Sequence, residues 1–175
     1  KLGVVPQQIA AGDVYPALER GTLDAAEFVG PYDDEKLGFY KVAPYYYYPG
    51  WWEGGAMLHL CINLEKWNSL TPTYQAILRQ AAEAANNWML AKYDAVNAPA
   101  LLRLIRAGVQ VKPFPVATID AAYKATQEIF ADIGSKNPLF KKANDSMVAF
   151  RGEQYPWWAV GEYSYDGYMI RAVRS

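Results

Sequence analysis

The chain has 175 residues, 17 Lys and Arg against 18 Asp and Glu, and a net charge of -1 at pH 7. Its 52% apolar content is enough for a buried core, and with 20% charged residues the composition excludes intrinsic disorder and a membrane-embedded chain. The balanced charge argues against nucleic acid, because phosphate binding needs a concentrated basic face. The unusual feature is aromatic: 6 Trp, 14 Tyr and 6 Phe.

The composition shifts once along the chain. Residues 1–69 are rich in Gly, Pro and β-branched or aromatic runs, whereas residues 70–175 have the pattern of long helices. This shift predicts an α/β portion over 1–69 followed by a helical region over 70–175. In the first portion we predict strands over 2–5, 23–28 and 56–63, a helix from Asp13 to Glu19 or Arg20 stopped by Gly21, and a brief helix from Asp33 and Asp34 through Phe39.

The helical region contains clear start and stop signals. Thr71 is expected to cap a long helix with Pro72 in its first turn, and Pro99 is expected to kink or restart that helix before Gly108. A strand over 109–114, a helix capped by Thr118 and ending at Gly134, and a helix opened by Asn137 and Pro138 follow. Residues 147–173 carry too many large aromatic side chains for one helix face, which suggests a second subunit as a partner.

The densest motif runs from Tyr45 to Gly55 and contains six aromatic residues, a carboxylate and two terminal glycines. The four tyrosines, 45–48, are most simply a buried strand that packs on both faces. For Trp52 and Glu53 the functional interpretation is favoured, because a carboxylate beside paired glycines lies where the backbone can approach a ligand closely. Trp52 and Glu53 are therefore candidate ligand-binding residues.

Glu27 is a further candidate functional residue. It follows two alanines and precedes Phe28, so a carboxylate lies at what is expected to be a buried strand end. Burial of a carboxylate is costly unless a cation or hydrogen-bond donors meet it. An internal salt bridge is one interpretation, and a metal-ion or ligand role is the other, because ligands bind at the carboxyl ends of strands in open α/β sheets.

Other chemical signals are weak. His59 is the single histidine and Cys61 the single cysteine, so a metal site built on these residue types is not expected. The sequence contains no GxxxxGK[ST], GxGxxG or GxSxG motif, which leaves phosphate cradles and a serine nucleophile unsupported.

Three classes of function fit these residues. The first is a binding protein for a small molecule, with Glu27, Glu53 and the aromatic cleft as its site. The second is a carbohydrate-active enzyme in which Glu27 and Glu53 form the acid and nucleophile pair while aromatic side chains stack on sugar rings. The third is a helical assembly module driven by the C-terminal aromatics, which would dimerise without responding to a ligand.

Two stretches carry a family resemblance: GVVPQQIAAGDVYPALERGTLDAAEFVGPYDD and KLGFYKVAPYYYYPGWWEGGAMLHLCIN. They resemble the second lobe of a solute-binding receptor of the tripartite ATP-independent periplasmic (TRAP) transporters, DctP type, in the subgroup that binds 2-oxo acids such as pyruvate. The resemblance implies an α/β, periplasmic binding protein-like (venus-flytrap) lobe with long C-terminal helices. It also implies a periplasmic protein that is not an enzyme and that delivers its ligand to TRAP membrane subunits.

The resemblance also implies a site. In this subgroup a sodium ion lies beside the ligand, held by positions that correspond to the Glu27 side chain, the Phe28 backbone carbonyl and the Glu53 side chain. A hard cation prefers oxygen ligands and can bridge these groups to the oxygens of a 2-oxo acid. Phe28 stands where a Trp is expected, which preserves a carbonyl ligand but alters the pocket wall.

The resemblance covers about half of a receptor. The ligand-pairing arginine of the family lies in a GLKxR-type strand, and Arg20 does not match that motif. The first lobe has no counterpart in these 175 residues. The C-terminal helix with Trp157 and Trp158 resembles the segment that reaches a partner subunit in dimeric members, so a homodimer is expected.

Overall fold

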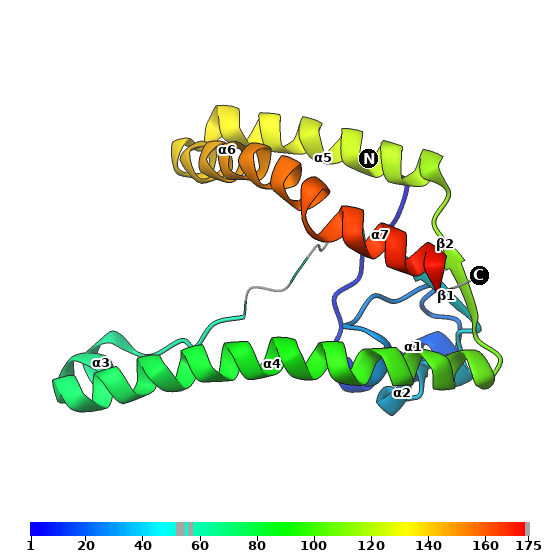
Figure 1. Cartoon of the computed structure of the whole chain (residues 1–175), viewed down its shortest axis with the longest axis horizontal. Helices are drawn as coiled ribbons and strands as arrows, with labels where there is room; N and C mark the ends of the chain where they lie inside the picture. Colours follow the sequence, from blue (N-terminus) through cyan, green and yellow to red (C-terminus); the bar gives the residue numbers. More distant parts are fainter. Residues whose placement is uncertain (52–54, 56–57, 174–175) are drawn as a thin grey trace. The chain divides into compact units, whose positions relative to one another are not determined.

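The computed structural model describes residues 1–51, 55 and 58–173 of the chain. Their contacts divide them into two compact units, residues 5–115 and residues 1–4 with 116–175 (Figure 1). The predicted division between a ligand-binding portion at 1–69 and a helical region at 70–175 differs from this grouping, because the long helix of residues 72–106 packs with the elements that precede it. As a statement about function, that division stays a prediction.

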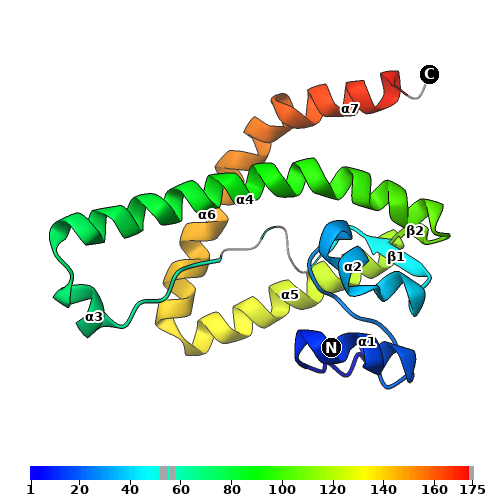
Figure 2. The same ribbon diagram turned by 90° about the horizontal axis from the view of Figure 1, so that it is seen from below.

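Residues 5–115 form four α-helices, a short 3-10 helix and a two-stranded sheet in the described part of the chain. In chain order the elements are α1 (Ala11–Glu19), α2 (Pro31–Leu37), the 3-10 turn η1 (Phe39–Lys41), β1 (Tyr45–Tyr48), α3 (Leu64–Ser69), α4 (Pro72–Arg106) and β2 (Gln110–Pro113). β1 pairs with β2 in parallel, with Tyr45 opposite Gln110 and Tyr48 opposite Pro113. α2 packs against α4 and lies along its C-terminal half (Figure 2).

Local sequence signals explain the helix ends. The Arg20 N–H caps α1, and Gly21 follows with φ +68°, the left-handed conformation that glycine adopts without strain. The Thr71 side chain accepts a hydrogen bond from the Tyr74 N–H at 3.4 Å at the start of α4. α4 is one helix that runs through Pro99, so the restart expected there does not occur.

The three strands expected over 2–5, 23–28 and 56–63 do not form in the described residues; residues 56 and 57 of the last one lie outside them. A strand needs a neighbouring backbone for its hydrogen bonds, and in the described part of the chain only β1 and β2 supply one another with such a partner. The segments are irregular and mostly exposed instead: Val4 is 75% exposed and Leu58 is 74% exposed. The apolar patterns of these three segments therefore did not predict a sheet correctly.

β1 confirms the strand predicted for the tyrosine run and corrects its burial. Tyr45, Tyr47 and Tyr48 are each about half exposed, because one neighbouring strand covers only one edge of β1. Tyr47 stacks on Phe114, with ring centroids 5.1 Å apart, and the Lys112 ammonium lies 4.3 Å from the centre of the Tyr45 ring. Tyr46 alone points to buried surroundings, described below.

Residues 116–173 form α5 (Val116–Lys136), α6 (Pro138–Val160) and α7 (Glu162–Ala172). α5 begins two residues before the expected Thr118 cap because Pro115 already fixes a backbone angle suited to a helix start. The Asn137 side chain accepts from the Phe140 N–H at 3.0 Å, which confirms the predicted start of α6. α5 packs on α6, with the Phe130 and Phe140 rings 5.6 Å apart.

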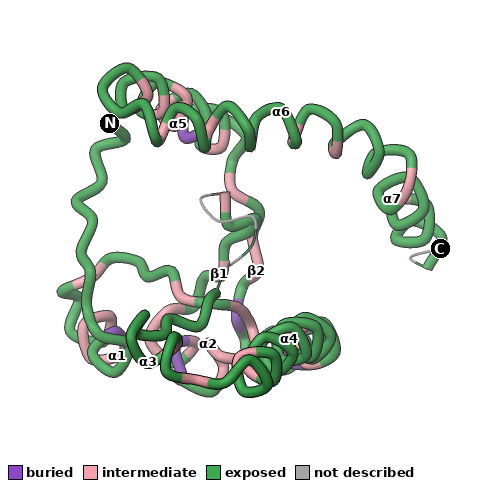
Figure 3. Tube along the Cα trace, turned by 90° about the vertical axis from the view of Figure 1, so that its left-hand side faces the viewer, coloured by how far each residue is buried: buried purple, intermediate pink, exposed green. Residues whose placement is uncertain are grey.

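The core is small. In the described part of the unit of residues 5–115 the buried apolar side chains are Val14, Phe39, Ala100, Leu104 and Val109, and in the other unit Ala122 is buried. Most of α4, α6 and α7 is exposed (Figure 3). No helix among the described residues is long and apolar enough to cross a membrane.

Candidate functional site

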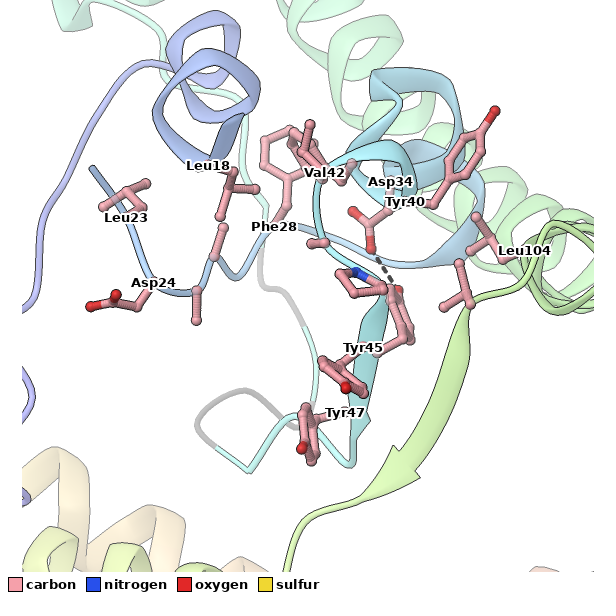
Figure 4. A pocket seen from close by; sticks show the side chains of 17 residues that line it. Leu18, Leu23, Asp24, Phe28, Asp34, Tyr40, Val42, Tyr45, Tyr47 and Leu104 are labelled. Carbon is pink, nitrogen blue, oxygen red and sulfur yellow. Dashed lines mark hydrogen bonds between the residues drawn. The ribbon is translucent and has the colours of Figure 1, made fainter. Parts of the chain in front are cut away.

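A cavity of about 290 Å³ lies within the unit of residues 5–115 (Figure 4). Its lining residues come from several elements. They are Leu18 on α1, residues 23–26 and Phe28, Asp34 on α2, residues 39, 40 and 42–47, and Leu104 and Val109. The cavity therefore brings together two stretches that the sequence singled out, the one around Glu27 and the tyrosine run.

Glu27 lies between two residues of the cavity wall, Ala26 and Phe28, but its own side chain is exposed. The expectation of a carboxylate at a buried strand end was wrong, because residues 23–28 do not join a sheet that would enclose it. None of the ion pairs formed by the described residues includes Glu27. The internal salt bridge considered from the sequence is thus absent there, and an exposed carboxylate stands beside the cavity.

Phe28 is half-buried and forms part of the cavity wall. Its ring meets the buried Phe39 ring edge to face, with centroids 5.7 Å apart and planes at 88°. This contact uses the side chain for packing, so the group of Phe28 that remains for a cation is its backbone carbonyl. Trp52 and Glu53, the other two candidate residues, lie outside the described residues, and their roles stay predictions.

The sequence analysis missed the buried polar pair in this cavity. The Tyr46 hydroxyl donates a hydrogen bond of 2.5 Å to Asp34 Oδ2, and Asp34 is only 8% exposed. Its other oxygen, Oδ1, is buried without a hydrogen-bond partner. Asp34 lies at the start of a helix that the sequence predicts, and no pattern in the sequence there indicates that its side chain is buried.

Burial governs the electrostatics of this pair. Loss of water raises the pKa of the Asp34 carboxyl, although the Tyr46 hydroxyl and the nearby N–H groups of Val29 and Gly30 act in the opposite direction. Burial and the neighbouring carboxylate also raise the pKa of the Tyr46 hydroxyl, so Tyr46 is a hydrogen-bond donor at neutral pH.

α2, which carries Asp34, is held against α4 at two points. The Tyr32 N–H donates to Asn97 Oδ1 at 3.0 Å. The Arg103 guanidinium binds the Glu35 carboxylate in a bidentate pair, with Nε to Oε1 2.7 Å and Nη2 to Oε2 2.6 Å, and it lowers the pKa of Glu35. These contacts fix the helix that follows directly after Glu27 and Phe28.

The donor set suits a hard cation. The described candidates are a carboxylate, Glu27, and a backbone carbonyl, Phe28, and oxygen is the ligand that sodium and calcium ions prefer. Among the described residues no group of three or more His, Cys, Asp and Glu side chains could hold a metal ion alone. A cation at this position would therefore need further oxygens, from Glu53 or from a bound ligand.

The cavity is lined mainly by apolar and aromatic side chains, with Asp24 and Asp34 among its lining residues and the exposed Glu27 beside it, and a cavity of this kind suits a small ligand. The chain belongs to the DctP family, bacterial extracellular solute-binding protein family 7, whose family model matches residues 1–137. This family comprises the solute-binding proteins of TRAP transporters and not enzymes, so the alternative of a carbohydrate-active enzyme with Glu27 and Glu53 as its carboxylate pair is not supported.

Similarity to individual known proteins points to the same family. The chain is 45% identical over 168 residues to the monocarboxylate 2-oxoacid-binding periplasmic protein all3028 of Nostoc sp., an alignment that covers 96% of this chain and 46% of the relative. A TRAP transporter solute-binding protein of Bordetella bronchiseptica, solved as a mixed-occupancy dimer with calcium and picolinate, has a TM-score of 0.92 and 49% identity over 98% of this chain and 51% of that one. A TRAP periplasmic solute-binding protein of Colwellia psychrerythraea with bound calcium and pyruvate has a TM-score of 0.89 and 33% identity over 93% of this chain and 50% of that one.

These comparisons confirm the family and the fold class expected from the sequence, a lobe of a periplasmic binding protein with long C-terminal helices. The chain spans about half the length of the relatives it matches. The arginine motif and first lobe of the resemblance are not among its 175 residues.

Proposed function

We propose that this chain is part of a TRAP solute-binding protein that binds a small 2-oxo monocarboxylate, such as pyruvate, together with a hard cation. The observation that carries the proposal is its 45% identity, over nearly its whole length, to a monocarboxylate 2-oxoacid-binding protein. The exposed carboxylate of Glu27 beside a cavity lined with aromatic side chains supports it.

The chemistry of the ligands in the two solved relatives is consistent with one kind of site. Pyruvate and picolinate each carry a carboxylate next to a second electron-pair donor, a keto oxygen in one and a ring nitrogen in the other. Either molecule can therefore hold a cation in a five-membered chelate ring. A 2-oxo acid brought to a lone Glu27 carboxylate would be repelled, and a cation between them removes that repulsion.

In this proposal the cation is held by Glu27, the Phe28 carbonyl and Glu53, and the ligand packs against Phe28 and Trp52. The bound cation supplies charge neutralisation and a fixed direction for the two ligand oxygens. The protein groups exclude water and set the size of the pocket. Phe28 is already fixed by Phe39, so the wall that it forms is in place before a ligand arrives.

The charge of the site bears on which cation binds more tightly. Two glutamates and one ligand carboxylate carry three negative charges, so calcium leaves one uncompensated charge and sodium leaves two. The family resemblance points to sodium, while the two solved relatives contain calcium. Both are hard cations that use oxygen ligands, and we expect the site to accept both with tighter binding of calcium.

Isothermal titration calorimetry of the protein expressed from its complete gene tests this proposal. After removal of metal ions with a chelator, pyruvate is titrated without added cation, with sodium and with calcium. Binding is expected only with a hard cation and is expected to be lost when acetate, which lacks the keto oxygen, replaces pyruvate. Equal binding with and without cation, or no binding of any 2-oxo acid, would show the proposal to be wrong.

The remaining partners follow from the same family. We infer a periplasmic protein that hands its ligand to TRAP membrane subunits and forms a homodimer through the C-terminal helices. Support for the dimer comes from the aromatic surface of α6 and α7, where Trp157 is 62% exposed and Tyr163 is 76% exposed. One solved relative is itself a dimer.

A further inference from the structure

Asp34 is the buried titratable group that the proposed site does not use. Its carboxylate lies in the wall of the cavity, six residues after Phe28, and Figure 4 shows it directed toward the strand that carries Tyr45 and Tyr47. Because a buried carboxyl with one oxygen unpartnered costs free energy, an apolar side chain would fill this wall more favourably if filling were its only role. The geometry around Asp34 indicates what the carboxyl does there.

Asp34 is joined to the backbone that follows Phe28. Its N–H donates to the Gly30 carbonyl at 2.9 Å, which closes the first turn of α2. The position of Asp34 therefore fixes the chain two residues after Phe28.

The same carboxylate joins this backbone to β1. Tyr46, which is half-buried in the middle of β1, donates to Asp34 Oδ2 at 2.5 Å. α2 is separately anchored on α4 through the Tyr32 N–H to Asn97 and through the Arg103–Glu35 pair. Asp34 is therefore the α2 side chain that links the α2–α4 pair to β1 on the other side of the cavity.

We propose that Asp34, with Tyr46 as its hydrogen-bond donor, is a positioning residue that fixes the Glu27 carboxylate and the Phe28 carbonyl for cation binding. This inference rests on the proposed function. Glu27 and Phe28 belong to a segment outside the sheet and outside the helices, and the hydrogen bond from the Asp34 N–H to the Gly30 carbonyl fixes the chain two residues after Phe28. Groups that orient the ligands of a metal ion typically change its affinity by 10- to 100-fold when they are lost.

The test compares three variants of the protein expressed from its complete gene. Tyr46→Phe removes the hydroxyl that binds Asp34, Asp34→Asn keeps an acceptor for that hydroxyl, and Tyr48→Phe removes a half-exposed hydroxyl from the same strand as a control. Calcium is titrated calorimetrically in the presence of pyruvate, and thermal unfolding is followed without ligand. We expect calcium affinity to fall about tenfold in Tyr46→Phe and to stay within about threefold of the wild type in the other two.

The outcomes separate this inference from the function on which it rests. A wild-type protein that shows no calcium-dependent binding of pyruvate contradicts the proposed function itself, and the inference falls with it. If the wild-type protein shows calcium-dependent binding of pyruvate and Tyr46→Phe has the same calcium affinity, the inference about Asp34 is wrong while the proposed function stands. A tenfold loss in Asp34→Asn would also overturn it, because the charge and not the hydrogen bond would then be at work.

A purely structural role is distinguished by measuring affinity well below the unfolding temperature. A variant that is fully folded there and binds like the wild type has lost only stability. If Tyr46→Phe has no cooperative unfolding transition, Asp34→Ala replaces it and is judged by the same tenfold criterion, since it removes the acceptor without altering β1.

Discussion

Glu27 stands between two residues of the cavity wall while its own carboxylate remains exposed and outside the ion pairs of the described residues. Replacing it by Gln keeps its shape and removes its charge. Because a neutral amide is a poor ligand for a hard cation, we expect Glu27→Gln to weaken calcium-dependent binding of pyruvate by at least about tenfold. Titration calorimetry checks this, with Glu19→Gln, an exposed glutamate at the end of α1, as the matched control. Wild-type affinity in Glu27→Gln would remove Glu27 from the cation site.

Asp34 predicts a pH dependence of stability. Burial raises the pKa of its carboxyl in the folded protein above the value of 3.8 typical of an exposed aspartate, so the native state binds this proton more tightly than the unfolded state. The stabilisation from the protonated group is present below pH 3.8 and is lost as pH rises through the folded-state pKa. In Asp34→Asn this group does not titrate.

The free energy of unfolding of Asp34→Asn minus that of the wild type should therefore increase as pH rises above 3.8 and level off above the folded-state pKa. Urea denaturation at a series of pH values measures this difference. Asp33, which lies next to Asp34, and Tyr46 are the titratable groups that act on it, and both are unchanged in the variant. A difference that is constant or decreasing over this range contradicts the assignment.

For single residues, the sequence indicated which side chains have suitable chemistry but not whether those side chains are buried. Glu27 was recognised because a carboxylate among alanines is conspicuous, yet its exposure could not be predicted without knowing that residues 23–28 join no sheet. Asp34 was overlooked for the opposite reason. Two adjacent acids at a helix start have an ordinary explanation in the helix dipole, and only the three-dimensional structure shows that one of them faces Tyr46.

Among the elements, α4 has the most uneven environment. Leu104 is 2% exposed and lines the cavity, whereas Leu102, two residues earlier, is 53% exposed. We expect Leu104→Ala to lower the free energy of unfolding by about 2 to 5 kcal/mol, because it leaves a void in the core, and Leu102→Ala to change it by less than about 1 kcal/mol. Chemical denaturation of both variants measures the two costs. Similar costs at the two positions would show that the C-terminal half of α4 is not packed as described.

Helices were predictable because their signals are local. Thr71 with Pro72, and Asn137 with Pro138, each carry a cap and a first-turn proline within two residues, and α4 and α6 begin there. Strands depend on partners that lie far away in sequence. The alternation in residues 58–63 and the apolar run 2–5 predicted strands that do not form, because no pattern inside those segments says which chain would pair with them.

At the scale of the whole molecule, the aromatic residues serve two regions. Those of 39–47 line the cavity, and those of α6 and α7 are largely exposed. If the exposed group is a dimer interface, Trp157→Asp should raise the dimer dissociation constant by roughly 30-fold, the effect of losing about 2 kcal/mol at a central tryptophan. Sedimentation velocity over a range of concentrations measures it.

The control for this prediction is Leu139→Asp, which places the same charge at a 77% exposed position near the start of α6. It should leave the dissociation constant unchanged. A dimer that tolerates Trp157→Asp as well as Leu139→Asp would place the interface elsewhere, and a protein that is monomeric at all concentrations would exclude the homodimer.

The parallel pairing of β1 with β2 has a consequence for how this chain folds. The two strands are joined through α3 and the whole of α4, so their ladder closes a long loop and gains little until that loop is ordered. A helix needs no such distant contact, and α4 can form from its own local signals. We therefore expect the sheet to assemble late, after α4 and α2 have docked, and the tyrosine strand to be among the first elements released on unfolding.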